Sequence, residues 1–264
     1  MPYTNDTKPT SSALPLAFVA ANQQVNSGQA TNSFSLTTSG SDRLLIVYCS
    51  DDALGTTTVT YGGVPMTAIT TQTDVSNFFK LSAFYLKNPT VGSNTVTATR
   101  TSSAGDFYVF ALAYKNAGQD TVPHTYTSSA QSAGTSQTVT LTTTAASCWT
   151  TLFTFADGGG LAASTGSTLR GSVLNTAAGV FDSNAALSAG SNSMSVTMGS
   201  GIRTSIMLAI ESIASPSNDR NPSLVLWDDA YVNWDSSLAG WDTVSAYSFT
   251  AEPTGSYTLD NEPT

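Results

Sequence analysis

The residues with the most distinctive chemistry lie near the end of the chain, where three Trp-Asp pairs recur seven residues apart. Trp227, Trp234 and Trp241 are each followed by Asp, and they are three of the four tryptophans in the sequence. Tryptophan is strongly enriched among the residues that dominate binding energy at protein interfaces, where it fills desolvated pockets. We interpret these residues, together with Tyr231 and Phe249, as anchors that attach an arm of the chain to a neighbouring subunit.

Two other interpretations of this arm stay open. The tryptophans would also be buried if the arm folded back onto its own chain, and their faces would also serve as platforms for sugar rings. The charge favours a partner, because residues 221–264 contain seven acidic residues and no Lys or Arg, whereas residues 1–220 contain eleven acidic and nine basic residues. The carboxylates of the arm would complement a basic or cation-lined groove.

The residues needed for catalysis are sparse. The single histidine, His124, follows Asp120-Thr121-Val122-Pro123, and the sequence has no Gly-x-Ser-x-Gly turn that would place a nucleophilic serine beside it. We interpret His124 as a lone histidine of a polar surface loop. A glycosidase needs two carboxylates across a cleft, and two of the three Glu residues lie in the arm. We therefore expect no catalytic residue and no enzyme, with a β-sandwich glycosidase built on Asp pairs as a remaining alternative.

Calcium is the one metal that the aspartates suggest. Asp51 and Asp52 open a turn, and Asp157 begins a run of three glycines that would bend around an ion. Calcium takes six to eight oxygen ligands, and the alternative is that these are solvated turn aspartates. Cys49 and Cys148 end apolar runs, so we expect two small buried residues rather than a disulfide. No other cofactor is expected.

Two hydrophobic patterns predict the elements that carry these residues. Short runs alternate between apolar and polar residues, as half-buried antiparallel strands do; they include Phe34–Leu36, Asn94–Thr99, Thr138–Leu141 and Ser193–Met198. Other runs are apolar almost without interruption, as central strands covered on both faces are, or bent strands that change sides; they are Leu44–Cys49, Phe107–Tyr114 and Ile206–Ile213. Turn residues separate them. The sequence predicts an all-β fold, an antiparallel two-sheet β-sandwich of jelly-roll type with a C-terminal extended arm.

Composition places the boundaries of this sandwich. We expect an N-terminal extension at 1–13, the β-sandwich at 14–214, a Pro- and Ser-rich linker at 215–223 and the acidic, Trp-rich arm at 224–264. The stretch 157–192 is rich in Gly and Ala, and we interpret it as an irregular connection of small residues.

Five segments, in a recurring order, resemble a known family. They are Arg43–Val47, Val59–Ile69, Tyr85–Pro89, Gly92–Thr99 and Ser205–Ile210. This order is similar to that of jelly-roll-like β-sandwich modules of bacterial surface proteins and tailed-phage structural proteins. The clearest mark is the VTYGG-x-P-x-T pattern that begins at Val59, and the similarity covers residues 14 to 214. The resemblance implies a binding or structural role without a catalytic motif.

The overall composition limits the classes of partner that the chain can bind. Only 10% of the residues are charged, and 78 of the 264 are Ser or Thr, which gives a neutral, polar surface. No Lys and Arg cluster is present to neutralise phosphates, so we expect no nucleic-acid partner. No run approaches the roughly 20 apolar residues of a membrane span, and the N-terminus makes a poor secretory signal.

We therefore expect a non-enzymatic structural protein of a phage-like virion, as a capsid decoration, a fibre or a tail-associated subunit. It would lie on the virion surface, form a homo-oligomer in the assembly and dock onto other virion subunits through its C-terminal arm. The alternative is a secreted, extracellular carbohydrate-binding β-sandwich module with a glycan ligand.

Overall fold

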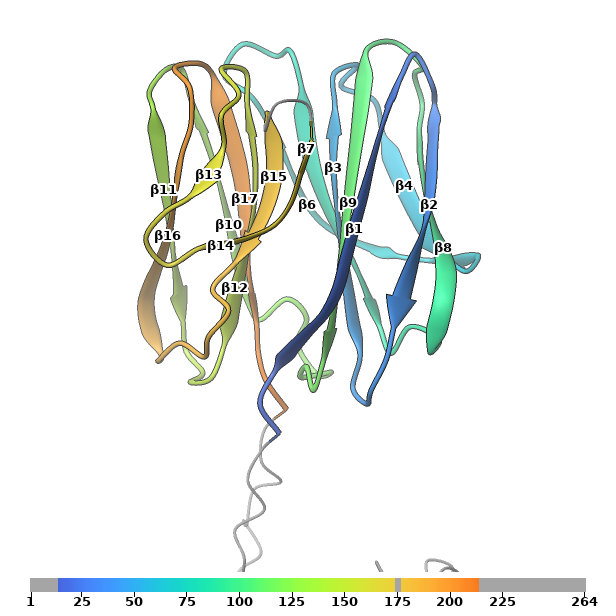
Figure 1. The fold of residues 1–264 in the computed structure, drawn as a ribbon, viewed down its shortest axis with the longest axis vertical. Coiled ribbons are helices and arrows are strands. Elements are labelled where there is room, and N and C mark those ends of the chain that lie inside the picture. Colours follow the sequence, from blue (N-terminus) through green and yellow to red (C-terminus); the bar gives the residue numbers. More distant parts are fainter. Residues whose placement is uncertain (1–13, 174–176, 214–264) are drawn as a thin grey trace, which may run out of the picture. The chain divides into compact units, whose positions relative to one another are not determined.

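A computed structural model describes residues 14–173 and 177–213 of the chain (Figure 1). In these residues all regular elements are strands. They are β1 (Ala17–Ser27), β2 (Thr31–Thr38), β3 (Leu44–Asp51), β4 (Thr57–Tyr61), β5 (Val64–Pro65), β6 (Thr67–Thr73), β7 (Lys80–Lys87), β8 (Gly92–Arg100), β9 (Asp106–Lys115), β10 (Thr125–Gln131), β11 (Ser136–Thr143), β12 (Trp149–Ala156), β13 (Ala162–Ala163), β14 (Thr168–Val173), β15 (Ala178–Asp182), β16 (Gly190–Thr197) and β17 (Arg203–Ile210).

The strands form four antiparallel sheets that make two sandwiches. Module 1, β1–β9, consists of inner sheet 1 (order β1-β9-β3-β7-β6) and outer sheet 1 (β2-β8-β4-β5). Module 2, β10–β17, consists of inner sheet 2 (β10-β17-β12-β15-β14) and outer sheet 2 (β11-β16-β13). The predicted all-β antiparallel sandwich is confirmed in its class. The prediction of only two sheets is wrong, because the described residues form four.

The two modules repeat one topology. The strands β1 to β4 match β10 to β13 in order, and β6 to β9 match β14 to β17, while β5 has no counterpart. With this match, the two inner sheets have the same strand order. The register agrees as well, since β6 and β14 each carry one irregularity, between Ala68 and Thr70 in β6 and between Leu169 and Gly171 in β14. Module 2 is therefore a structural repeat of module 1.

The two hydrophobic patterns of the sequence separate inner from outer strands. All residues of β3, β12 and β17 are buried, as are all but the terminal residues of β9, because an inner sheet is covered on one face by its outer sheet and on the other by the second inner sheet. Burial alternates along β2 and β11, which cover a core with one face only. The prediction that the continuous apolar runs form strands covered on both faces is confirmed.

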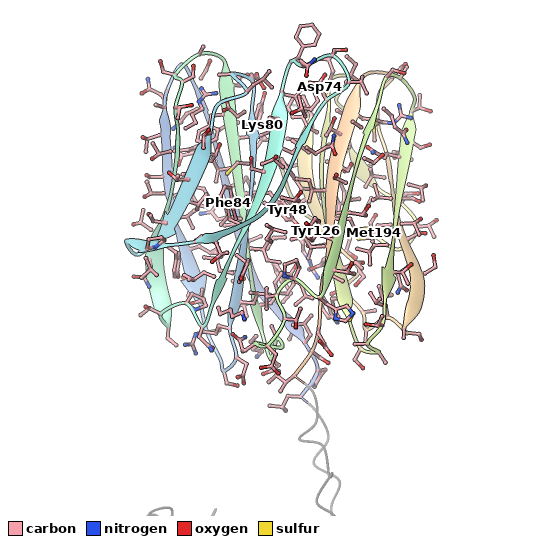
Figure 2. The ribbon with its side chains drawn as sticks, turned by 180° about the vertical axis from the view of Figure 1, so that it is seen from behind. Tyr48, Asp74, Lys80, Phe84, Tyr126 and Met194 are labelled. Atoms are coloured by element: carbon pink, nitrogen blue, oxygen red, sulfur yellow. The ribbon has the colours of Figure 1, made fainter. Side chains whose placement is uncertain are left out.

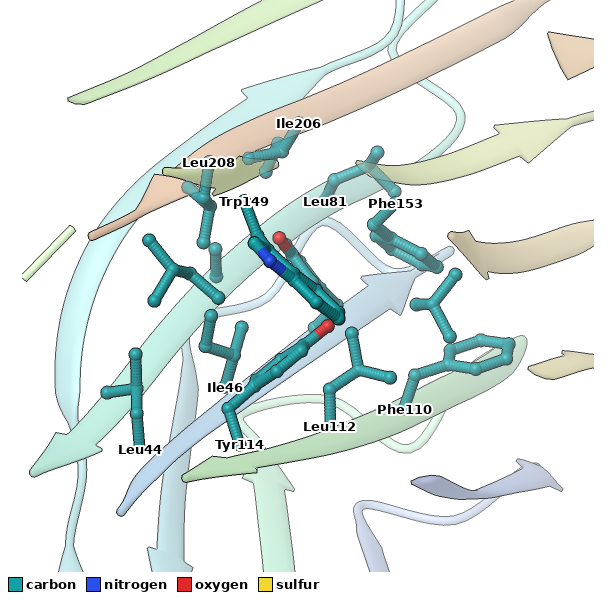
Figure 3. Close-up of a cluster of buried hydrophobic side chains, with 14 of the residues drawn as sticks. Leu44, Ile46, Leu81, Phe110, Leu112, Tyr114, Trp149, Phe153, Ile206 and Leu208 are labelled. Carbon is teal, nitrogen blue, oxygen red and sulfur yellow. The ribbon is translucent and has the colours of Figure 1, made fainter. Parts of the chain in front are cut away.

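One hydrophobic core joins the two modules. Its side chains come from both inner sheets, and Figure 3 shows part of it, including Ile46, Leu112, Trp149, Phe153 and Leu208. One smaller core fills the interior of each sandwich. The layers therefore run from outer sheet 1 through inner sheets 1 and 2 to outer sheet 2.

Equivalent residues meet at the centre of the joining core. The first residue of β3, Leu44, pairs with Tyr114 of β9, and the first residue of β12, Trp149, pairs with Ile210 of β17. Counting four residues on from each, Tyr48 in β3 is equivalent to Phe153 in β12. The rings of Tyr48 and Phe153 stack with centroids 5.4 Å apart. Contact between equivalent residues is the mark of an isologous interface. The two modules therefore pack as a dimer with two-fold symmetry would, within one chain.

Polar groups also cross this apolar interface, and two of these contacts are buried. The hydroxyls of Tyr48 and Thr151 are hydrogen-bonded at 2.6 Å. The Tyr114 hydroxyl donates to Asp182 at 3.1 Å, and the Arg170 guanidinium donates to the same carboxylate oxygen at 2.8 Å. Burial, together with the charge of Asp182, holds the pKa of Tyr114 well above its usual range, so this phenol stays a donor. The buried Asp182 carboxylate thus links both modules.

Two further predictions concern particular segments. The stretch 157–192 is not an irregular connection but contains β13, β14 and β15; its small residues allow close approaches, as where the Gly171 backbone lies against the side chain of Gln23. Cys49 and Cys148 are buried and free, as predicted. The VTYGG pattern forms the hairpin of β4 and β5, with Gly62 and Gly63 both at positive φ as a two-residue turn requires.

The carboxylate of Asp182 supplies a direct test of the module interface. We expect Asp182→Asn to lower the free energy of unfolding by about 3–5 kcal/mol, because it leaves the largely buried Arg170 guanidinium without a counter-charge. The double variant Arg170→Met, Asp182→Asn should recover most of this loss, since no buried charge remains. Urea unfolding followed by far-UV circular dichroism measures both. A single variant within about 1 kcal/mol of wild type would contradict this role.

Candidate functional site

The two ends of the described body are held together by the segment that joins the modules. The side chain of Asn116 donates to the carbonyl of Pro15 at 2.9 Å, and the amide of Ile213 donates to the carbonyl of Asn116 at 3.0 Å. In Figure 1 the start of β1 and the end of β17 lie side by side at one end of the body. We call this end the stem end. Whatever precedes residue 14 and follows residue 213 therefore leaves the body from one place.

His124 lies beside this stem end, and its surroundings differ from the prediction. Its ring is largely buried, with an exposed fraction of 13%. Nε2 accepts the backbone N–H of Thr144 at 3.1 Å, which places the proton of the neutral ring on Nδ1, 3.5 Å from a carboxylate oxygen of Glu211. His124 lies in a loop, as predicted, but the prediction that it stands alone there is wrong. His124 is a cross-link between the β11–β12 turn and the end of β17.

Cys148 adjoins the same cluster. Burial, and secondarily the charge of Glu211, raises the pKa of the Cys148 thiol to about 11. Its thiol lies 3.5 Å from the carbonyl of Ala145. A nucleophilic cysteine needs a lowered pKa, so these surroundings favour a packed thiol over a reactive one.

The opposite end of module 1 contains the first calcium candidate, Asp51. Its Oδ1 accepts from Arg100 at 2.6 Å and from the amide of Ala53 at 2.9 Å, and its Oδ2 accepts from the amide of Gly55 at 2.7 Å. The Asp51 and Arg100 side chains are almost fully buried. Arg100 also donates to the carbonyl of Gly105. Asp51 is thus the buried counter-ion of an arginine that ties three chain segments together.

Asp52 and Asp157 occupy equivalent turns of the two modules. Asp52 accepts the amide of Asp106 at 3.3 Å. Removal from water raises its pKa to about 6, and the Asp106 and Asp51 charges add to this, while the Asp106 amide and Arg100 oppose it. Asp157 follows β12 as Asp52 follows β3, and it is exposed. Within residues 14–173 and 177–213, no three metal-ligating side chains come together as a metal site.

A rigid turn projects an aromatic side chain from this same end of the body, which Figure 2 marks by Asp74 and Lys80. Asp74, at the end of β6, accepts three backbone amides, those of Ser76, Phe78 and Phe79, at 2.7–3.0 Å. Phe79 points into the joining core, whereas Phe78 is 68% exposed. We call residues 74–79 the tip.

The outer sheets present two uncharged faces. Each outward position of β2, β4, β8, β11 and β16 is Ser or Thr. The hydroxyls bond across the strands at equivalent places: Ser33 with Thr97 at 3.1 Å in module 1, and Thr138 with Ser195 at 2.8 Å in module 2. β-branched Thr favours strands, and paired hydroxyls contribute cross-strand stabilisation. These faces are therefore hydrated without any ionised group.

The predicted arm anchors lie outside the described residues, together with the linker and the rest of the arm. These anchors are Trp227, Tyr231, Trp234, Trp241 and Phe249. Of the calcium candidates, Asp51 and Asp52 lie together beside Arg100. Asp157 lies apart from them, in the equivalent turn of module 2.

Three residues that organise the two ends were not singled out from the sequence: Arg100, Asn116 and Asp74. A local signal existed only for Asp74, because an Asp followed by Ser and Asn is typical of a turn in which the Asp side chain accepts backbone amides.

Comparison with known proteins adds no relative. The chain matches no protein-family model, no curated protein and no solved structure. Within the described residues, no helix has the length and apolar character needed to cross a membrane.

The raised pKa of Asp52 predicts a pH dependence of stability. Because the folded chain holds this proton more tightly than the unfolded chain, stability should fall as the pH rises from about 4 to about 6. Asp52→Asn should remove this decline and be more stable than wild type at pH 7 by about 1 kcal/mol, a value reduced for the partial exposure of the group. Thermal unfolding at several pH values measures it. The exposed Asp157→Asn is the matched control and should change nothing; parallel curves for Asp52→Asn and wild type would refute the assignment.

Proposed function

We propose that the chain is a non-enzymatic structural protein of a phage-like virion, which displays its two-module body on the virion surface and attaches through its C-terminal arm. The observation that carries this proposal is the stem end. The described residues nearest both terminal segments lie together, tied by Asn116 to Pro15 and Ile213. A body held from this end leaves its outer faces and the tip free.

The outer faces support a role at a particle surface. A face made of Ser and Thr keeps its hydration when pH or salt changes, because it contains no charge to titrate or screen. Such a face also offers little for non-specific adhesion, since it presents neither an apolar patch nor a charged field. Both modules repeat this feature on opposite outer sheets.

The arm supplies the attachment in this proposal. Burying one tryptophan removes about 150–250 Å² from water, or about 4–6 kcal/mol before costs. Ordering the arm costs about 1–2 kcal/mol per fixed residue. One anchor is therefore too weak to hold the chain, so this proposal requires Trp227, Trp234 and Trp241 to act together. Their partners are other virion subunits, and copies of this chain surround them in an oligomeric assembly.

A second candidate function, a secreted carbohydrate-binding module, is favoured by the tip. An exposed aromatic ring on a rigid turn is a suitable platform for a sugar ring, and Phe78 is such a ring. The genes beside this one distinguish the candidates, since capsid, portal and tail genes support the virion and a polysaccharide-degradation cluster supports the secreted module.

The attachment by the arm is tested with the triple variant Trp227→Ala, Trp234→Ala, Trp241→Ala. We expect the body to stay folded, as shown by an unchanged thermal unfolding temperature, while the variant fails to be incorporated into particles because its anchors are gone. A variant with Val225, Val232 and Val244 changed to Ala is the matched control for apolar residues of the arm.

Two results would oppose the proposal. Normal incorporation of the triple tryptophan variant would show that the arm is not the attachment. Unfolding of the body would show instead that the tryptophans belong to the chain's own core.

A further inference from the structure

The tip is built to hold its exposed residues in place. Besides the three amides bound by the Asp74 carboxylate, the amide of Asn77 donates to the carbonyl of Asp74 at 3.3 Å, and the amide of Asp74 donates to the carbonyl of Phe79 at 3.1 Å. Five hydrogen bonds thus close a turn of residues 74–79. The Asp74 side chain is 4% exposed, so its charge is directed inward to the turn and not outward to a ligand.

The base of the tip is fixed in the core that joins the modules. Phe79 is buried, and its ring lies 4.3 Å from that of Phe155 in β12, centroid to centroid. Because Phe79 occupies this position, Phe78 cannot turn inward without displacing it. Phe78 is the most exposed of the large hydrophobic residues in the described part of the chain, and Val75 on the same turn is 48% exposed. The turn therefore presents an aromatic ring on a rigid support.

The module fold does not require this tip. The equivalent connection of module 2 joins β14, which ends at Val173, to β15, which begins at Ala178. It is two residues shorter, and its sequence, Leu174-Asn175-Thr176-Ala177, has neither an aromatic residue nor an acidic one. The two modules share the strand order of their inner sheets and the irregularity of the preceding strand. The greater length of the tip and its exposed aromatic residue are therefore specific to module 1.

The exposed groups of the tip define the chemistry of a ligand. One aromatic face and one aliphatic side chain are far smaller than the roughly 800 Å² that each partner contributes to a stable protein interface. They match the C–H face of a single sugar ring. Ser76 and Asn77, both exposed between Val75 and Phe78, offer a hydroxyl and an amide to the ring's own hydroxyls. The exposed residues of the tip, 75–78, include no Lys or Arg, so the tip favours a neutral ligand over an anionic one.

We propose that the tip, Asp74–Phe79, is a binding site for a neutral saccharide, in which Phe78 stacks on the face of one sugar ring while Ser76 and Asn77 bind its hydroxyls. This binding site is a function additional to attachment through the arm. It does not depend on that attachment, because the purified chain contains the tip even when no particle is present. It lies away from the stem end, so that a body held at its stem would direct the tip towards its surroundings.

The test uses the full-length chain in solution and a panel of neutral oligosaccharides of glucose, galactose, mannose and N-acetylglucosamine, each screened at millimolar concentration by saturation-transfer NMR. A saccharide that shows transfer is then titrated against wild type and variants. We expect millimolar binding that Phe78→Ala weakens about ten-fold or more, the loss typical of one stacking contact, and that Phe78→Tyr preserves. Asp74→Ala should weaken binding too, because it loosens the turn; its fold is checked by thermal unfolding.

Leu169→Ala is the matched control, since Leu169 is an exposed apolar residue on β14, outside the tip, and it should bind as wild type does. A panel in which no saccharide shows saturation transfer overturns the proposal, and so does binding that survives Phe78→Ala. If Phe78→Ala instead impairs incorporation into particles while no saccharide binds, the tip serves a protein contact and the saccharide assignment is wrong.

Discussion

The packing of inner sheet 1 against inner sheet 2 is the contact on which the other features of the body depend. It makes both faces of the inner sheets interior surfaces, so β3, β12 and β17 are buried along their whole length and β9 along all but its terminal residues. The outer sheets then provide the hydrated faces of the sandwiches, which is why hydroxyl residues fill the outward positions of β2, β8, β11 and β16. The same contact fixes the tip, because Phe79 of module 1 packs on Phe155 of module 2.

Apolar packing alone does not specify how two such sheets are aligned, since many registers bury a similar area. The polar contacts of Tyr48 with Thr151 and of Tyr114 with Asp182 break this degeneracy. They also break the symmetry of the repeat. Asp182 stands where module 1 has Tyr85, and Arg170 stands at the irregularity where module 1 has Ile69. A buried ion pair is costly unless its geometry is satisfied, so this pair favours one alignment of the modules over others.

The sequence predicted the strands well and their grouping poorly. Alternating runs such as Thr138–Leu141 and continuous runs such as Leu44–Cys49 were correctly interpreted as strands covered on one face and on both. Two classes of strand already imply more than two layers, since a two-sheet sandwich covers each sheet on one face only. The repeat left two short traces, Gly-Ser-Asn at 92–94 and 190–192 and Leu-Thr-Thr at 36–38 and 141–143. At other equivalent positions the two modules share only the burial of the residue and not its type, as at Tyr48 and Phe153. Hydrophobic periodicity cannot reveal a repeat of this kind.

The candidate sites were less predictable because they are made by residues far apart in the chain. Arg100 meets Asp51 across 49 positions, and Asn116 meets Pro15 across 101. Neither pairing has a local pattern. His124 shows the same limit, since its polar neighbours in sequence predicted a solvated loop, whereas its contacts are Thr144 and Glu211. Local turn chemistry is readable from sequence, and long-range side-chain contacts are not.

Native-state hydrogen exchange tests most directly the claim that one core unites the two modules. In rising denaturant, the slowest amides of β3 and β9 and those of β12 and β17 should converge on one unfolding free energy and one denaturant dependence, because neither inner sheet can open without exposing the other. Two separate free energies, with the strands of one module exchanging while those of the other stay protected, would contradict the shared core.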